Sequence, residues 1–159
     1  MDDPQIRYAR TEDGVNIAYW AMGSGPPIVL MDLPYSNVQY ELSMPNSRAG
    51  YEAIAQNVTL VRYDHRGFGL SDTYKQDFTT NGLVCDLEAV VDKLALPRFF
   101  LIANRGPTYP IALAYAKLHP ERVRRIAAVV GGPPVGFVPG ILDTPGWTGS
   151  SSAKHFRVG

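Results

Sequence analysis

Three short, largely apolar runs recur along the chain and are separated by stretches with helical patterns. The runs cover residues 27–31, 58–63 and 99–103, and none shows the strict polar–apolar alternation of a half-exposed strand. Strands buried on both faces have this character, which is typical of a parallel sheet between two helix layers. The spacing therefore predicts an α/β fold.

The flanking elements complete this alternation. Asp13-Gly14 is a hairpin signal between two predicted strands. The order of all elements predicts an antiparallel edge that leads into a parallel, doubly wound sheet with right-handed crossovers. The hairpin strands are expected at residues 6–10 and 15–22, helices at 51–56, 83–94 and 109–118, and a last strand at 123–130.

The helix expected at 83–94 carries recognisable end signals. Thr79, Thr80 or Asn81 can cap its start, and Pro97 is expected to end it. Beyond residue 132 the pattern changes to glycine, proline and serine, without periodicity. We therefore expect a core over 1–132 and a tail or extended arm over 133–159.

Charge and composition exclude several classes of function. Fifteen basic residues balance fifteen acidic ones, which argues against nucleic-acid or anionic-membrane partners. The chain has one cysteine and three widely spaced histidines, so neither a disulfide nor a metal site is expected. No leader-like or membrane-spanning apolar run is visible. The expectation is a cytoplasmic protein without a cofactor.

Several motifs resemble those of the α/β-hydrolase family. Residues 64–72 resemble its D-x-R-G-x-G-x-S-D loop, 86–92 resemble the following helix, and 112–116 with 119–123 resemble the helix behind the nucleophile elbow. Ser36-Asn37-Val38 and Tyr63-Asp64 are similar to hydrolase modules found beside adenylate-cyclase or LuxR-type regulators.

The resemblance covers about residues 6–132. It implies a trimmed α/β-hydrolase core with no cap domain. About six mostly parallel strands are expected, in the order 1-2-4-3-5-6, with helices on both faces.

The sequence departs from this family at the reacting positions. The family's G-x-S-x-G elbow falls on residues 104–108, so Gly106 stands at the nucleophile position and Pro107 follows it. The His-Gly of the family's oxyanion loop becomes Asp32-Leu33. Glycine has no nucleophile, proline has no N–H to donate, and a carboxylate opposes developing negative charge. The resemblance thus implies a vestigial pocket lined by Asp32, Leu33, His65, Arg105, Gly106 and Pro107.

The expected strand order brings Asp32, His65 and Arg105 to one edge of the sheet, with Ser36 and Asp64 nearby. One interpretation is a salt-bridged plug, in which Arg105 neutralises Asp32. A second is a small polar or anionic ligand held by Arg105. A third is an improvised catalytic site in which Ser36 attacks, His65 acts as base and Asp32 assists.

Two further residues, Asp143 and His155, follow in the family's order of acid and histidine. They are only 12 positions apart. They form either a displaced catalytic pair or two positions on a solvated tail.

These observations favour a degenerate family member that binds or assembles and has no serine-hydrolase chemistry. A weak esterase or lactonase with a relocated nucleophile is one alternative, and a truncated reading frame is another. The strand at 123–130 should form a sheet edge that the tail covers either on a neighbouring copy or on its own chain. Self-association into a homo-oligomer through this edge or the tail is expected.

Overall fold

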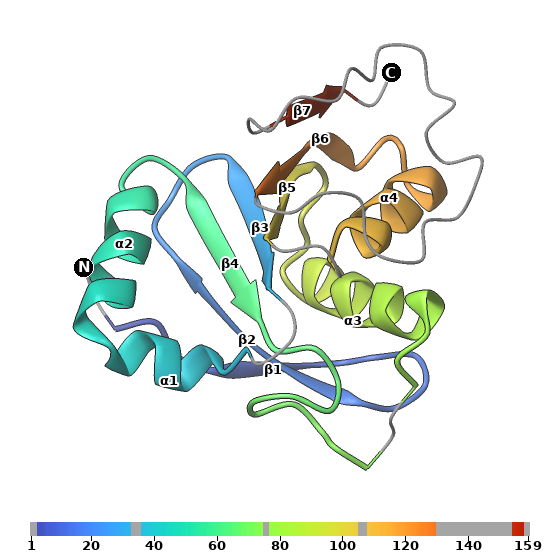
Figure 1. Cartoon of the computed structure of the whole chain (residues 1–159), viewed down its shortest axis with the longest axis horizontal. Helices are drawn as coiled ribbons and strands as arrows, with labels where there is room; N and C mark the ends of the chain where they lie inside the picture. The colour runs from blue at the N-terminus through green and yellow to red at the C-terminus, as the bar shows by residue number, and fades with distance from the viewer. Residues whose placement is uncertain (1–2, 33–35, 75–76, 105–107, 130–153, 158–159) are drawn as a thin grey trace.

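The computed structural model describes residues 3–32, 36–74, 77–104, 108–129 and 154–157. They form one seven-stranded sheet in the order β1-β2-β4-β3-β5-β6-β7 (Figure 1). The first six strands have the expected order, and β3 lies between β4 and β5. The strands are β1 (Arg7–Arg10), β2 (Asn16–Met22), β3 (Pro27–Asp32), β4 (Thr59–Tyr63), β5 (Phe99–Asn104), β6 (Val123–Val129) and β7 (Lys154–Arg157).

The sheet is parallel at its centre and antiparallel towards both edges. The hairpin strands β1 and β2 pair antiparallel, and β2 continues antiparallel onto β4. The strands β4, β3, β5 and β6 then run parallel to one another. This arrangement confirms the predicted antiparallel edge leading into a parallel sheet.

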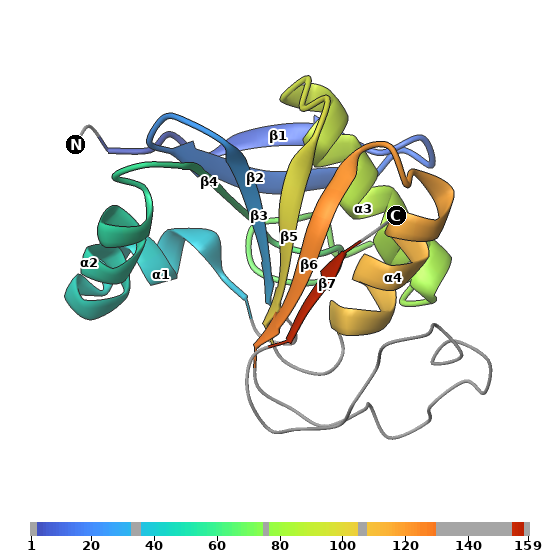
Figure 2. The ribbon, with the colours of Figure 1, turned by 90° about the horizontal axis from the view of Figure 1, so that it is seen from above.

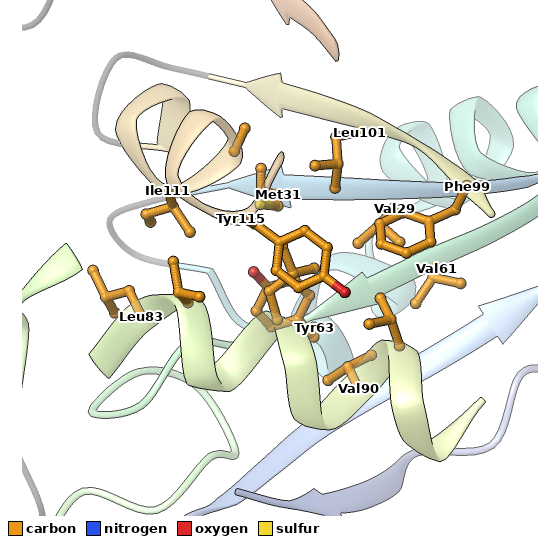
Figure 3. Close-up of a cluster of buried hydrophobic side chains, with 14 of the residues drawn as sticks. Val29, Met31, Val61, Tyr63, Leu83, Val90, Phe99, Leu101, Ile111 and Tyr115 are labelled. Atoms are coloured by element: carbon orange, nitrogen blue, oxygen red, sulfur yellow. The ribbon is translucent and has the colours of Figure 1, made fainter. Parts of the chain in front are cut away.

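Helices cover the two faces unequally. The helices α3 (Thr80–Lys93) and α4 (Thr108–Leu118) lie on one face, whereas α1 (Val38–Ser43) and α2 (Pro45–Ile54) lie on the other, towards β2 and β4 (Figure 2). The main hydrophobic core fills the α3/α4 side (Figure 3). Its members include Val29, Met31, Val61, Tyr63, Leu83, Val90, Phe99, Leu101, Ile111 and Tyr115.

Local signals explain the helix ends. The Thr79 hydroxyl accepts a hydrogen bond from the Gly82 N–H at the start of α3, which confirms one of the three expected caps. The helix ends at Lys93, before Pro97, because Ala95 adopts a left-handed φ of 50°. Within the described residues, no helix is long and apolar enough to cross a membrane.

The start of one expected helix was wrong. The helix expected at 51–56 begins earlier, at Pro45, and α1 precedes it, because Asn37 caps α1 through the Tyr40 N–H and proline occupies the first position of α2. The edge of β6 is covered by β7, which belongs to the expected tail and pairs antiparallel with residues 125–128. This is one of the two arrangements expected for the tail.

Candidate functional site at the carboxyl edge of the sheet

Asp32 and Asn104 end the neighbouring strands β3 and β5 and are partners in the strand register. The Asn104 side-chain amide donates a hydrogen bond of 3.1 Å to the Asp32 carboxylate. The buried Thr108 hydroxyl, at the start of α4, donates to the Asn104 carbonyl at 3.2 Å. The end of β5 is therefore tied both to β3 and to the first turn of α4.

Arg105, the expected partner of Asp32, lies outside the described residues, as do Leu33, Gly106 and Pro107. The Asp32–Arg105 ion pair therefore stays a prediction. Asn104 is the partner that sequence reasoning missed, although both residues end adjacent strands and that placement could have indicated their contact.

Asp64 anchors the loop that follows β4. Its carboxylate accepts the Val38 N–H at 3.0 Å and the Leu70 N–H at 2.9 Å. Burial raises the pKa of Asp64, while these two donors and the Ser36 hydroxyl act in the opposite direction. The buried Ser36 thus lies beside the Asp64 carboxylate and not beside His65, the base expected for it.

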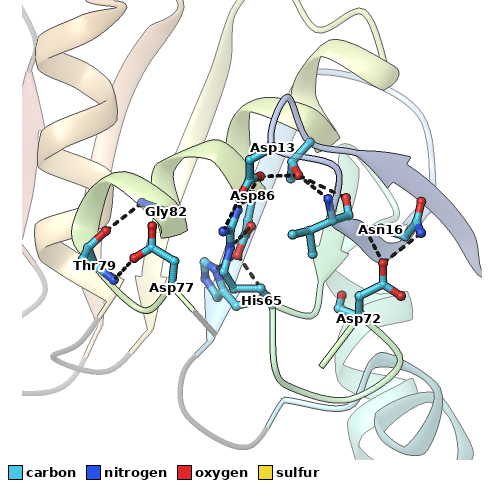
Figure 4. Close-up of polar contacts among 12 residues, drawn as sticks. Asp13, Asn16, His65, Asp72, Asp77, Thr79, Gly82 and Asp86 are labelled. Atoms are coloured by element: carbon cyan, nitrogen blue, oxygen red, sulfur yellow. Dashed lines mark hydrogen bonds and ion pairs between the residues drawn. The ribbon is translucent and has the colours of Figure 1, made fainter. Parts of the chain in front are cut away.

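His65 belongs to a different cluster, on the α3 side (Figure 4). Its Nδ1 lies 3.4 Å from Asp86 Oδ2, and both side chains are fully buried. Its Nε2 has no hydrogen-bond partner. Among the described residues, no hydrogen bond joins Ser36 to His65, because the consecutive residues Asp64 and His65 direct their side chains to different elements.

Arg66 forms the centre of a buried ionic network. Its Nε donates to Asp86 at 2.8 Å, and its terminal nitrogens donate to Asp13 at 2.9 and 3.2 Å. The Thr11 hydroxyl also donates to Asp13. Arg66 thereby joins the β1–β2 turn to α3.

Two further features of the described residues concern possible ligand sites. No group of three or more His, Cys, Asp or Glu side chains among them is placed to hold a metal ion. A cavity of about 430 Å³ lies between β1 and α3, and neither Asp32 nor Asn104 lines it. It holds Cys85, whose thiol pKa is raised by burial, which makes this thiol less reactive at neutral pH.

Comparison with known proteins places the chain near α/β hydrolases. No protein-family model matches it. It is 29% identical over 117 residues to the AB hydrolase superfamily protein YclE of Bacillus subtilis, covering 72% of this chain and 38% of that protein. It is 26% identical over 126 residues to a cis-3-alkyl-4-alkyloxetan-2-one decarboxylase of Shewanella oneidensis, covering 77% and 38%.

Solved structures show the same fold. An epoxide hydrolase of Vigna radiata superimposes with a TM-score of 0.67 at 22% identity, covering 82% of this chain and 40% of that one. A meta-cleavage product hydrolase gives a TM-score of 0.63 at 21% identity, covering 76% and 43%. The chain thus has the α/β-hydrolase fold and spans about two-fifths of the length of the curated relatives that it matches.

Proposed function

We propose that this α/β-hydrolase-fold chain binds or assembles and does not perform serine-hydrolase chemistry. The observation that carries the proposal is Asp32. A carboxylate, held by Asn104, ends β3 where the resemblance calls for the His-Gly of an oxyanion loop. Negative charge at this position opposes the oxyanion that acyl transfer must stabilise.

The residues of the elbow support the same conclusion. Gly106 stands at the nucleophile position and carries no hydroxyl, and Pro107 has no backbone N–H to donate. The chain therefore has no hydroxyl at the nucleophile position, no backbone donor at the residue that follows, and a negative charge where the oxyanion would form. All three features are unsuited to ester hydrolysis.

The relocated nucleophile gains no support from the side-chain contacts. A serine nucleophile needs a base within hydrogen-bond reach. The carboxylate of Asp64, beside Ser36, already accepts two backbone N–H groups. The histidine of the relocated site, His65, contacts Asp86 instead of Ser36. The hydrolase and decarboxylase activities named for the relatives belong to those longer proteins.

Hydrolysis of p-nitrophenyl acetate tests the proposal directly. The purified chain should release product no faster than buffer and should not react with a fluorophosphonate probe. The Gly106→Ser variant should also stay inactive, because Asp32 and Pro107 remain. Turnover that is lost in Ser36→Ala or His65→Ala, with folding intact, would contradict the proposal and establish the relocated nucleophile.

The binding part of the proposal rests on the charge of Arg105. Titration calorimetry with phosphate and with acetate should show heat of binding that the Arg105→Ala variant lacks. Lys117→Ala, on the exposed side of α4, is the matched control for loss of a positive charge. Equal binding by both variants would remove Arg105 as the ligand-holding residue.

A further inference from the structure

The strand β1 forms one edge of the sheet, beside α3 (Figure 1). It pairs with β2 on one side, and no strand among the described residues pairs with its other side. An edge strand presents backbone N–H and C=O groups that can pair with another chain. The register with β2 determines which residues of β1 present these groups.

Tyr8 and Arg10 direct their backbone groups away from the sheet. Their partners in the register are Ala18 and Asn16 of β2. Both partners use their own N–H and C=O groups on the opposite side, towards β4 and the loop that follows it. Because hydrogen-bonded and non-hydrogen-bonded pairs alternate in an antiparallel ladder, Ala9 bonds to β2 and its two neighbours face outwards.

The cavity of about 430 Å³ between β1 and α3 adjoins this edge. We call it the β1 groove. Arg10 and Glu12 line it on the strand side, and Cys85, Ala89 and Lys93 line it on the helix side. The β1 groove therefore has one wall from an edge strand and one wall from a helix.

The helix wall of the β1 groove is the flank of α3, beside the face that packs in the core. Leu83, Leu87 and Val90 belong to the core face and are buried. Cys85 and Ala89 are only partly buried, and they lie one helical turn apart on the flank. These two uncharged residues offer a contact surface for the side chains of a bound segment.

An edge strand beside a groove with a helical wall is suited to β-augmentation. In this mode an extended peptide adds to the sheet as a further strand. Main-chain hydrogen bonds supply affinity, and alternate side chains of the peptide enter the groove and supply specificity. The outward backbone groups of Tyr8 and Arg10 and the adjacent β1 groove provide both parts.

Two of the acidic residues that line the β1 groove already have basic partners. Glu88 Oε1 lies 3.0 Å from His119 Nε2, and Asp92 binds Arg122 at 2.7 Å. Both carboxylates therefore interact within the chain.

The basic residues at this edge have no such partners. Within the described part of the chain, Arg7, Arg10 and Lys93 form no ion pair, and all three are exposed. Among the carboxylates that line the β1 groove, Glu12 alone is likewise unpaired within that part. Unpaired positive charge therefore exceeds unpaired negative charge, so an acidic segment complements this edge. A second copy would bring the same cations, and like charges on paired strands are destabilising.

From these observations we infer that β1 and the β1 groove form a docking site for an extended acidic segment of another protein, which adds to the sheet as a strand beside β1. The backbone of Tyr8 and Arg10 pairs with the segment, while Arg10 and Lys93 attract its acidic side chains. Because neither Asp32 nor Asn104 lines the groove, this inference goes beyond the proposed function and does not depend on the absence of hydrolysis.

Fluorescence anisotropy with a short fluorescein-labelled peptide of alternating threonine and glutamate tests the site. The peptide should bind the full chain at low ionic strength, and the affinity should fall as salt is added. The same peptide with lysine in place of glutamate should bind at least about tenfold more weakly. A fully N-methylated form keeps the charges but has no backbone N–H to donate, so its affinity should fall by a similar factor.

Substitutions of Tyr8 test strand addition from the side of the protein. Tyr8→Pro removes an outward N–H without removing a hydrogen bond between β1 and β2, a position at which an edge strand accepts proline. Its affinity for the acidic peptide should be at least about tenfold lower. Tyr8→Ala keeps the N–H and should bind as the wild type does. Circular dichroism and urea denaturation establish that both variants are folded.

A second pair of variants tests the charges. Arg10→Glu should weaken binding by about tenfold, because it places a carboxylate beside the acidic peptide. Lys117→Glu makes the same charge change on the exposed side of α4 and should bind as the wild type does.

Three results would overturn the inference. No binding of the acidic peptide at millimolar concentration would remove the docking site. Equal binding by Tyr8→Pro and Tyr8→Ala, or by the N-methylated and unmodified peptides, would show attraction by charge without strand addition. If light scattering shows a dimer that Tyr8→Pro dissociates, the edge belongs to a second copy and not to an acidic segment.

Discussion

Gly69 lies directly against the carboxylate of Asp64, and a Cβ on Gly69 would overlap both carboxylate oxygens. Gly69 also adopts a left-handed φ of 53°. Glycine at this position lets Asp64 keep its hydrogen bonds to the Val38 and Leu70 N–H groups. The small size of Gly69 therefore allows Asp64 to join the loop after β4 to the start of α1, through the Val38 N–H.

Replacement of Gly69 by alanine should destabilise the fold. The backbone cost is about 1–2 kcal/mol, and displacement of Asp64 leaves buried donors unsatisfied at about 1–3 kcal/mol each. We expect the free energy of unfolding in urea to fall by about 3 kcal/mol.

Gly50→Ala provides the matched control. Gly50 lies in α2, and a Cβ there would meet nothing within 4 Å. Because alanine is the better helix former, this variant should be neutral or more stable by up to about 1 kcal/mol. Equal losses at the two glycines would contradict the special role of the Gly69–Asp64 contact.

The ionic network around Arg66 should contribute strongly to stability. Asp86→Asn keeps the shape of the side chain but removes the charge that faces Arg66 and His65. Removing one partner of a buried ion pair costs about 3–5 kcal/mol. Since Asp13 still pairs with Arg66, we expect a loss of about 3 kcal/mol in urea denaturation.

An exposed ion pair serves as the comparison. Asp92 binds Arg122 at 2.7 Å, and the Asp92 side chain is 57% exposed. Asp92→Asn should cost no more than about 1 kcal/mol. A loss for Asp86→Asn as small as that for Asp92→Asn would show that the buried network adds little to the stability of the fold.

Sequence patterns predicted the elements that have local signals, but they did not predict the contacts that join distant parts of the chain. The hairpin turn, the Thr79 cap and the buried strands each depend on a sequence pattern only a few residues long. The helix α1 has six residues, too few to show a helical period. Arg66 meets carboxylates 53 and 20 positions away, a spacing that no periodicity reveals.

The candidate site was predicted only in part, for a similar reason. The strand order placed Asp32 at the carboxyl edge, but its hydrogen bond to Asn104 depends on register across two parallel strands. The opposite orientations of Asp64 and His65 depend on how the chain leaves β4. Arg62 is a charged residue inside an otherwise apolar strand, and a buried charge of this kind indicates a buried partner of opposite charge. In the structure that partner is Glu41.

Tyr51 should make stability depend on pH in the alkaline range. Its hydroxyl donates to Glu41 at 2.6 Å, and burial raises the pKa of Tyr51 from 10.0 to about 12. Between these values the native state binds more protons than the unfolded state, so the free energy of unfolding should fall as pH rises from 10 to 12. Below this window the contribution of the hydrogen bond is fully present.

The variant Tyr51→Phe isolates this contribution. At neutral pH this variant should be less stable than wild type by about 1 kcal/mol, because the hydrogen bond to Glu41 is absent. Phenylalanine does not titrate, so the stability of the variant lacks the alkaline pH dependence that Tyr51 causes. The stability difference between wild type and variant should therefore shrink across the window, as measured by urea denaturation at a series of pH values. A difference that stays constant would assign the contact a role in packing alone.

Asn104→Asp should turn the hydrogen bond at the carboxyl edge into a pH-sensitive pair. At acidic pH the new carboxyl is protonated and can still donate to Asp32 at the position that Asn104 now occupies. Two neighbouring carboxylates raise one native pKa above its unfolded value, so the native state binds the extra proton more tightly. Stability relative to wild type should therefore fall as pH rises from the ordinary range of aspartate through the raised native pKa. Because both residues are partly exposed, we expect a loss of about 1 kcal/mol by neutral pH.

Asn104→Ala removes the donor without adding a charge. Once Asp32 is ionised, the stability loss of this variant should therefore not change as the pH rises further. If urea denaturation gives Asn104→Asp the same flat difference as Asn104→Ala, then Asp32 and residue 104 do not interact at the end of β3 and β5.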